Sequence, residues 1–336
     1  PAPRRLPPGW KSLLSPLPNI AYRFGIPVMR RALSEWATQK WWDMVVLDGL
    51  YAGWALPFLD NLQGPGGRRP RVVYVSHNHE ETTRSGIARN YTGNPAIKTA
   101  LQLDALKTRR LERNMVDRAD LITAITRQDA EMYHERRPGK QLIVLPPGYS
   151  GERVSHRLIT ADLPRRAVVV GSFEWVAKRM NLERFLSVAD PLFAARGAEL
   201  HIVGNGDPAF MDRMRQRFRA TRFLGSVPEV QSHLSEARIA VVPELSGGGF
   251  KLKVLDYVFN RLPIASLDGA VAGVPLQSPD SLLSYPTFEA LAGGVVTAID
   301  DLALLNTLHN RAYTACANRF EWGLRGETLL AYAAAA

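Results

Sequence analysis

The stretch RIAVVPELSGGGFKLKVLDYVFNRLPIAS, residues 238–266, decides the fold. An apolar run at 238–243 predicts a buried strand, and three consecutive glycines follow it at 247–249. Helical spacing of apolar residues then continues to about Asn260, and a second apolar run occupies 262–267. Because both runs are apolar throughout, the order of strand, loop, helix and strand predicts a parallel sheet covered by helices.

The same alternation continues through most of the chain. In the first half we expect a long amphipathic helix over 98–119 and strands within 41–49, 70–78, 120–126 and 140–149. In the second half we expect helices over 181–197 and 210–218 and strands within 167–173, 199–207 and 221–227. Two such runs predict an α/β protein with two doubly wound domains, whose ligands lie beyond the carboxyl ends of the strands.

The domain boundary is expected where this alternation is interrupted. Residues 150–166 are polar and have no clear period, so we place the boundary near residue 160. The expected domains are therefore 1–160 and 161–319. A C-terminal helix over 320–336 is expected to join the first domain.

Composition restricts the classes of function. Lys and Arg total 42 of the 336 residues against 32 Asp and Glu, and the net charge of +10 favours anionic partners. We do not expect nucleic acid among them, because no nucleic-acid-binding motif is found and the arginines are scattered along helices. Cys316 is the single cysteine, so no internal disulfide can form, which predicts a protein of the reducing cytoplasm.

Two segments bear on contact with membranes. The longest apolar run, at 49–59, is too short to cross a bilayer. The segment RRLPPGWKSLLSPL, residues 4–17, combines Arg, Lys, Trp and Leu as interfacial segments do. The sequence therefore allows peripheral contact of a cytoplasmic protein with the inner face of the membrane.

The glycine-rich loop has the properties of an anion site. Gly247, Gly248 and Gly249 lack Cβ atoms, so their backbone N–H groups can approach a ligand closely. A helix N-terminus with free N–H donors follows, and Lys251 and Lys253 add two ammonium groups beside it. This combination predicts phosphate binding, although the loop matches neither the P-loop nor the dinucleotide-binding pattern. The alternative is a flexible turn with two solvated lysines.

Several segments resemble the retaining, family 4-like glycosyltransferases of the GT-B fold, known as glycosyl transferases group 1. The resemblance covers most of residues 40–330 and is most specific in the second half. It lies in GSFEWVAKRMNLERFL (171–186), ELHIVGNGDP (199–208) and residues 221–266, and more loosely in SHNHE (76–80) with LERNMVDRADLITAIT (111–126).

The resemblance implies both a fold and an activity. The fold would be GT-B, with two Rossmann-like parallel-sheet domains facing a cleft, the donor bound by the second domain and the acceptor by the first. The activity would be transfer of a sugar from a nucleotide-diphosphate sugar, with UDP or GDP, and with retention of anomeric configuration. Expected acceptors are a sugar, a polysaccharide or a lipid-linked molecule, in polysaccharide or glycoconjugate biosynthesis. No metal and no further cofactor are expected.

The resemblance also implies roles for individual residues. Lys178 would neutralise the diphosphate, Asp256 would bind the ribose, and His77 would lie near the donor sugar. His77, Lys178 and Lys253 are the predicted catalytic residues. The predicted donor-binding residues are Gly171, Ser172, Lys178, Gly204, Val227, Gly247, Gly248, Gly249, Phe250, Lys251, Leu252 and Asp256.

The sequence departs from the family pattern at the donor site. Where the family has a pair of glutamates eight positions apart, this chain has Gly248 and Asp256. The first carboxylate is therefore absent, and nearby Glu244 is a candidate to replace it. The family's arginine beside the strand-end glycine is Ser172 here, so Lys251 or Lys253 would supply the missing charge. These departures leave a catalytically inactive relative, acting as a nucleotide- or sugar-binding scaffold, as the alternative function.

The acceptor side is predicted from the first half of the chain. His77 ends a predicted strand, and Glu80, Glu81 and Arg84 follow it and are expected to shape the acceptor site. His77 and His79 share one strand face, a spacing that metal ligands can have, but no second cluster accompanies them. The alternative role for His77 is a hydrogen bond within its own loop.

One element that the resemblance implies is missing from the sequence. The family has a first strand and a Gly-rich loop, which should precede residues 11–24. Residues 1–20 have no such pattern, so the chain either lacks this element or begins after it.

Overall fold

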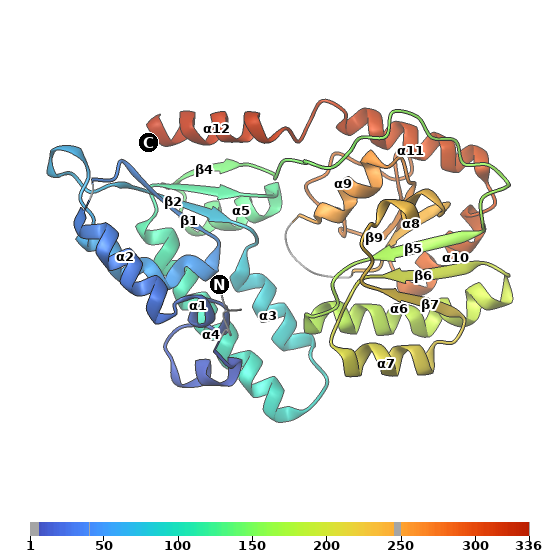
Figure 1. Cartoon of the computed structure of the whole chain (residues 1–336), viewed down its shortest axis with the longest axis horizontal. Helices are drawn as coiled ribbons and strands as arrows, with labels where there is room; N and C mark the ends of the chain where they lie inside the picture. Colours follow the sequence, from blue (N-terminus) through green and yellow to red (C-terminus); the bar gives the residue numbers. More distant parts are fainter. Residues whose placement is uncertain (1–6, 40, 245–249, 336) are drawn as a thin grey trace. The chain divides into compact units, whose positions relative to one another are not determined.

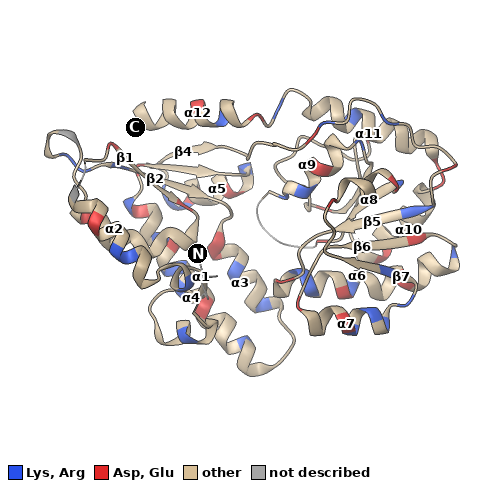
Figure 2. Cartoon of the chain, in the orientation of Figure 1, with Lys and Arg blue, Asp and Glu red and all other residues tan. Residues whose placement is uncertain are grey.

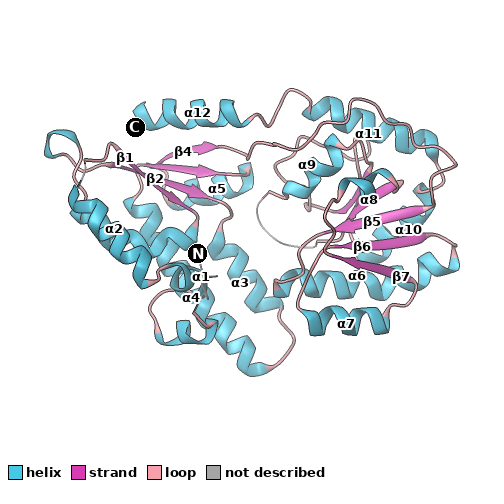
Figure 3. Cartoon of the chain, in the orientation of Figure 1, coloured by secondary structure: helices cyan, strands magenta, loops and turns pink. Residues whose placement is uncertain are grey.

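The computed structural model describes residues 7–39, 41–244 and 250–335 (Figure 1). The chain divides into two compact units. The first unit runs to Pro146 and is completed by the C-terminal residues from Gly323, and the second unit is Pro147–Trp322. Both units are α/β structures with one sheet each (Figure 3).

The division between the units falls earlier than the residue 160 expected from sequence. Residues after Pro146 pack against the second unit, although they form no regular element. The backbone N–H of Val154 donates to the carbonyl of Phe259 at 2.8 Å, and Arg157 donates to the carbonyls of Ala237 and Asn260. The lack of periodicity at 150–166 therefore marks an extended strap on the second unit.

The sheet of the first unit is entirely parallel. Its strands lie in the order in which they occur in the chain: β1 (Met44–Asp48), β2 (Arg71–Ser76), β3 (Leu121–Ala124) and β4 (Gln141–Val144). The helices are η1 (Gly9–Leu14), α1 (Asn19–Phe24), α2 (Pro27–Gln39), η2 (Leu50–Asn61), η3 (Pro65–Gly67), α3 (Glu80–Asn90), α4 (Pro95–Arg118), α5 (Arg127–Arg136) and α12 (Trp322–Ala335). Within described residues 7–39, ahead of β1, the regular elements are helical.

Alternation along β2 explains how both faces of this sheet are covered. Tyr74 points into a core shared with η2, α4 and α5, and Val73 points to the opposite face. On that second face Val73 packs with Leu121, Ile143 and Ala333, the last of these from α12. Arg71 also donates a hydrogen bond to the Ala333 carbonyl. The C-terminal helix thus closes the face that the sequence-adjacent helices leave open.

The sheet of the second unit is also parallel, but its order reverses. The spatial order is β10-β9-β8-β5-β6-β7, built from β5 (Arg166–Val170), β6 (Glu199–Val203), β7 (Thr221–Gly225), β8 (Ile239–Val242), β9 (Ile264–Leu267) and β10 (Leu283–Tyr285). The helices are α6 (Val176–Ala195), α7 (Pro208–Arg217), α8 (Gln231–Ser235), α9 (Leu252–Phe259), α10 (Phe288–Ala298) and α11 (Leu302–Cys316). Helix α6 packs with α10, and α9 packs with α11.

This strand order defines where a ligand should lie. The chain lays β5, β6 and β7 outward in one direction and then returns to place β8, β9 and β10 on the other side of β5. The loops after β5 and β8 therefore leave the sheet in opposite directions. In open α/β sheets the crevice at such a switch point is the usual ligand site. Two parallel α/β units were predicted from the sequence, and the structure confirms them.

Candidate functional site: a lysine cluster at the switch point of the second sheet

A cluster of charged side chains occupies the switch point between β5 and β8. Glu244 follows β8, and Lys253 lies in the first turn of α9, which the same loop leads into. The Lys253 ammonium donates to the carbonyl of Val170, at the end of β5, at 3.1 Å. It also pairs with a carboxylate oxygen of Glu244. Lys253 therefore ties together the carboxyl ends of the two strands that diverge here.

Two further lysines surround the same carboxylate. Lys251 places its Nζ 3.8 Å from Oε2 of Glu244, and the Glu244 and Lys251 side chains are 11% and 10% exposed. Lys178, in the first turn of α6, interacts electrostatically with both Glu244 and Lys253. Three ammonium groups around one carboxylate give the cluster a surplus of two positive charges.

The pKa shifts follow from this crowding. Burial raises the pKa of Glu244, but the three ammonium groups outweigh burial and hold the pKa below its usual value. Burial lowers the pKa of Lys251, and it lowers the pKa of Lys178 in the same way. In both lysines Glu244 opposes the shift, while neighbouring lysines add to it. The cluster is thus short of negative charge.

The positions of two of these lysines are unusual for helix termini. Lys178 and Lys253 each lie in the first turn of a helix, where the helix dipole disfavours a cation by about 0.3–1 kcal/mol. Within the described ranges, neither α6 nor α9 has a hydrogen bond from the side chain of its N-cap residue to its first turn. The first N–H groups of an α-helix have no partner inside the helix and can bind an anion. Two helix N-termini and three ammonium groups at one switch point are the features of a site for a multiply charged anion.

Glycines shape the strand exits beside the lysines. Gly204, which follows β6, has a φ of +129°, and a Cβ added to it would lie 1.8 Å from the carbonyl oxygen of Gly171. A Cβ at Gly171 would lie 3.9 Å from Nζ of Lys253. The two backbones therefore touch, and glycine at 204 is a steric requirement of this contact.

Asp256 lies apart from the lysines in its contacts. Burial raises its pKa, and a hydrogen bond from Tyr149 opposes the rise. Burial also raises the pKa of Tyr149, and the carboxylate of Asp256 raises it further. Asp256, on α9 one turn beyond Lys253, thus forms a second polar pair with Tyr149. This position suits hydroxyl recognition, as the sequence predicted for Asp256, and that role stays a prediction.

The other predicted donor residues have varied surroundings. Phe250 packs against Phe320, with ring centroids 5.7 Å apart, and Val227 is partly buried against the core. Ser172 and Leu252 are exposed. Gly247, Gly248 and Gly249 lie outside the described residues.

In the first unit, His77 pairs with an aspartate that the sequence analysis did not identify. Nε2 of His77, just past β2, lies 2.6 Å from Oδ1 of Asp48, the last residue of β1. The Tyr51 hydroxyl donates to Oδ2 of Asp48 at 3.0 Å, and the Tyr51 ring packs edge-on against the His77 ring. Burial and the Asp48 carboxylate raise the pKa of Tyr51 to about 12. His77 therefore bonds across to the neighbouring strand, rather than within its own loop.

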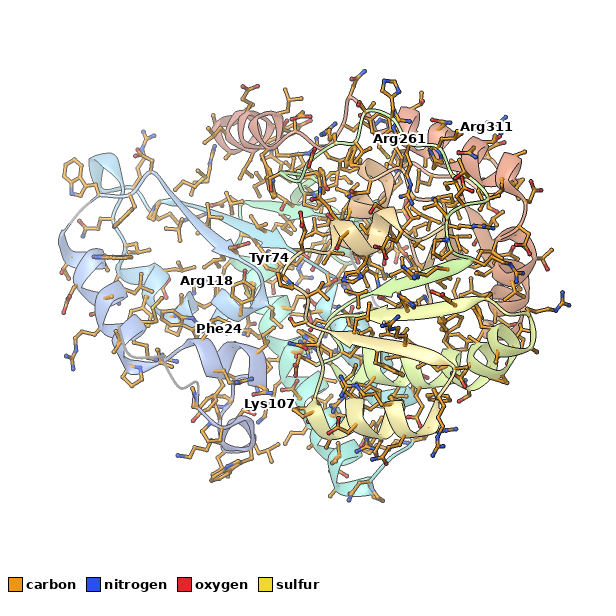
Figure 4. The ribbon with its side chains drawn as sticks, turned by 45° about the vertical axis from the view of Figure 1, so that its right-hand side comes forward. Phe24, Tyr74, Lys107, Arg118, Arg261 and Arg311 are labelled. Carbon is orange, nitrogen blue, oxygen red and sulfur yellow. The ribbon has the colours of Figure 1, made fainter. Side chains whose placement is uncertain are left out.

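The loop after His77 is held by a buried polar network. Glu112 of α4 accepts hydrogen bonds from the backbone N–H groups of Glu80 and Glu81, at 3.0 and 2.6 Å, and so caps α3. The Tyr133 hydroxyl donates to Glu112 at 2.6 Å, and Tyr74 lies 3.3 Å from the same oxygen. Figure 4 labels Tyr74 on the first sheet. The network fixes the start of α3.

The predicted acceptor-side residues pair with one another on this helix. Arg84 Nε donates to Oε2 of Glu80 at 3.1 Å, one turn apart on α3. His79 is buried, and its Nδ1 lies 2.6 Å from the Thr82 hydroxyl. His77 and His79 have separate partners, and no group of three potential metal ligands occurs among the described residues.

Sequence reasoning could have found some of the missed residues. Asp48 ends an apolar strand and is followed by Gly49, whose φ is +76°, which is a recognisable strand-exit pattern. The role of Glu112 depends on a fold-specific contact between α4 and α3 and has no local signal. The same holds for Tyr149, which reaches Asp256 from a distant part of the chain.

Residues 164–301 match the family model described as glycosyl transferases group 1. This segment contains both strand exits, all three lysines and Asp256 of the second unit. The comparison therefore confirms the predicted resemblance to glycosyl transferases group 1 over these residues. No curated protein matches the chain in a sequence search.

Solved glycosyltransferase structures resemble the chain in fold. Sucrose-phosphate synthase from Thermosynechococcus elongatus has a TM-score of 0.67 at 17% identity, and the match covers 92% of this chain and 78% of that one. Anabaena HepE in complex with UDP-glucose has a TM-score of 0.64 at 11% identity, covering 91% and 82%. A mutant of TarM from S. aureus, solved with Fondaparinux, alpha-GlcNAc-glycerol and UDP, has a TM-score of 0.62 at 12% identity. The match covers 86% of this chain and 55% of TarM, so this chain spans about half the length of TarM. The chain thus has the GT-B fold.

Proposed function

We propose that this protein is a glycosyltransferase that moves a sugar from a nucleotide-diphosphate sugar to an acceptor with retention of anomeric configuration. The lysine cluster at the switch point of the second sheet carries the proposal. Its surplus of two positive charges matches a diphosphate diester, which bears one negative charge on each phosphate. The match to glycosyl transferases group 1 over the same residues supports this assignment.

The charges also suit the chemistry. Departure of a nucleoside diphosphate develops negative charge on the leaving group, and fixed cations in a half-buried site stabilise it. Lys178 and Lys253 would serve this purpose, since both lie in helix first turns that direct N–H donors to the same place. The departing diphosphate would accept the acceptor proton, so the reaction needs no enzymic nucleophile. Asp256 would bind the ribose.

The first unit would hold the acceptor. His77, whose Nε2 lies 2.6 Å from Oδ1 of Asp48, would hydrogen-bond a sugar hydroxyl through its other ring nitrogen rather than act as a base. The acceptors that fit are a sugar, a polysaccharide or a lipid-linked molecule, in polysaccharide or glycoconjugate biosynthesis. HepE and TarM were solved with UDP-glucose and with UDP, which favours UDP as the nucleotide to test first.

Location is part of the proposal. The chain has a single cysteine, Cys316, which is buried and forms no disulfide, and this suits a protein of the cytoplasm. No helix in the described part of the chain is long and apolar enough to cross a membrane. Peripheral contact would use η1, where Trp10 and Leu14 are 63% and 88% exposed beside Lys11.

The test is sugar release or transfer from UDP- and GDP-sugars by the full chain. The expected result is turnover by the wild type and its loss in Asp256→Ala. The control is Glu183→Ala, on α6, whose side chain pairs with Arg217 of α7 at 2.6 Å. Turnover that Asp256→Ala leaves unchanged would reject the assigned ribose contact. Absence of turnover with every sugar tested, despite nucleotide binding, would favour the second candidate below.

The second candidate is a scaffold that binds nucleotide or sugar without chemistry. It is favoured by one observation: Gly248 stands where the family has its first glutamate. Glu244, the nearby carboxylate, is already paired with Lys251 and Lys253. A free carboxylate for the donor sugar is therefore missing among the described residues of this loop.

A further inference from the structure

A cavity of about 460 Å³ in the first unit is lined mainly by arginines. It lies between the second half of α4 and the end of α5. The charged residues that line it are Arg109, Arg110, Arg113, Arg136, Arg137 and Asp117. Figure 2 shows basic and acidic positions interspersed over the helices of both units, so a concentration of one sign in one cavity is unusual for this chain.

Three of these arginines converge on one carboxylate. Arg113 forms a bidentate pair with Glu81, through Nε at 3.1 Å and Nη2 at 2.9 Å. Arg136 donates to Glu81 at 3.0 Å, and Arg109 lies 3.2 Å from it. Burial raises the pKa of Glu81, but the arginines outweigh burial and hold the pKa below its usual value.

The charges in the cavity do not balance. Arg137 pairs with Asp117 at 2.6 Å, and the Arg110 side chain makes no ion pair with any residue in the described ranges. Five guanidinium groups thus face two carboxylates, Glu81 and Asp117. Arginines that only interact with solvent on a helix surface do not require a common carboxylate that fixes their orientation. Nor do they require a shared cavity. A surplus of three positive charges in a preorganised cavity is the arrangement that recognises phosphate.

We propose that this arginine cavity binds a phosphate group, and, resting on the proposed function, that the acceptor carries this phosphate. Glu81, which the arginines hold, is the second residue of α3. It directly follows Glu80, a predicted acceptor-side residue, and lies four residues after His77, which is predicted to lie near the donor sugar. The arginine cavity and the loop after His77 are therefore both joined to the start of α3. A bound phosphate and the acceptor hydroxyl would thus be held by the same part of the first unit.

The test is direct binding, without nucleotide and without turnover. sn-Glycerol 3-phosphate is titrated into the full chain by calorimetry, and vesicles of phosphatidylcholine with or without phosphatidylglycerol are tested by sedimentation. The double variant Arg109→Gln/Arg110→Gln removes two charges but leaves Arg113 and Arg136 on Glu81. The control is Arg118→Gln, an exposed arginine of the same helix that pairs with Asp60 and does not line the cavity.

We expect the double variant to raise the Kd for the phosphate ester at least about tenfold, because charge-assisted contacts are lost. The control should keep the wild-type Kd. Binding of sn-glycerol 3-phosphate supports a soluble phosphate ester as the ligand, and binding of phosphatidylglycerol vesicles alone supports a lipid-linked one. Equal binding by the double variant and the wild type, or no binding of either probe, overturns the proposal.

This result is independent of the donor site. Lys253→Met should leave binding of sn-glycerol 3-phosphate unchanged, because Lys253 belongs to the second unit. A chain that binds UDP but neither phosphate probe would refute the arginine cavity and leave the proposed function standing. A chain that binds the phosphate ester through Arg109 and Arg110 but binds no nucleotide would refute the proposed function and leave the phosphate site standing.

Discussion

Glu112→Gln should remove a pH dependence of stability from the first unit. Glu112 is 2% exposed, and its carboxylate accepts hydrogen bonds from two backbone N–H groups of α3 and from Tyr133. Burial raises its pKa from 4.5 to about 7, and these hydrogen bonds limit the rise. A Gln side chain would place its NH2 group against a backbone N–H donor at the start of α3. The variant should therefore also be less stable at low pH, by about 1–3 kcal/mol.

The sign of the pH effect follows from the raised pKa. The folded state holds the Glu112 proton more tightly than the unfolded chain does. Its favourable contribution to the free energy of unfolding is complete below pH 4.5 and is lost as the pH rises through 7. A rise of this size corresponds to about 3–4 kcal/mol, of which about 2–3 kcal/mol falls between pH 5 and pH 8.

Urea unfolding followed by tryptophan fluorescence measures this change, since five of the seven tryptophans lie in the first unit. The free energy of unfolding of the wild type, relative to that of Glu112→Gln, should fall by about 2–3 kcal/mol from pH 5 to pH 8. The control is Asp117→Asn, on the same helix. A hydrogen bond from Arg137 lowers the pKa of Asp117 below 3.8, so its contribution is lost only at more acidic pH. A difference between wild type and Glu112→Gln that is equal at both pH values would refute the reasoning.

Three other substitutions test the sites. Lys178→Ala should lower turnover by on the order of a hundredfold with little change in folding, and unchanged turnover would reject its role at the diphosphate. His77→Ala should impair transfer more than nucleotide binding, whereas equal loss of both would indicate a structural role. Gly204→Ala should destabilise the second unit by at least about 3 kcal/mol in urea unfolding, because its Cβ would overlap the Gly171 carbonyl. Gly293→Ala, in a helix of the same unit with open space around it, is the control, and similar stability of the two variants would contradict the steric argument.

Most of the fold followed from local patterns in the sequence. The apolar run before Pro243 forms β8, and the residues with helical spacing after Lys251 form α9. Periodicity and β-branched runs act locally, so they survive in any tertiary context that buries them. The boundary was the main exception, because the strap after Pro146 has no periodicity and is held by hydrogen bonds to the second unit.

The candidate site was predictable in part. Gly171, Lys178 and Lys253 lie near one another because strand exits meet at one edge of a parallel sheet, which the sequence pattern implies. That Lys253 would bond the Val170 carbonyl and Glu244 could not be predicted, because such contacts depend on how α9 packs. The buried Glu112 carboxylate was hidden for the same reason.

The arginine cavity shows why charge counts alone are weak predictors. The net charge of +10 indicated an anionic partner but not where it would bind. In the sequence, Arg109 and Arg113 are two arginines of an amphipathic helix, and Arg136 belongs to another. Only the fold brings all three to Glu81.

The most direct test of the account is calorimetric titration of UDP, GDP and ADP into the full chain. At least one of these nucleotides should bind, and Lys253→Met should raise its Kd at least about tenfold. Arg215→Gln, an exposed arginine of α7 that pairs with Asp212, should leave the Kd unchanged. Failure of all three nucleotides to bind the wild type at millimolar concentration, or equal binding by Lys253→Met, would contradict the assignment of the lysine cluster as a diphosphate site.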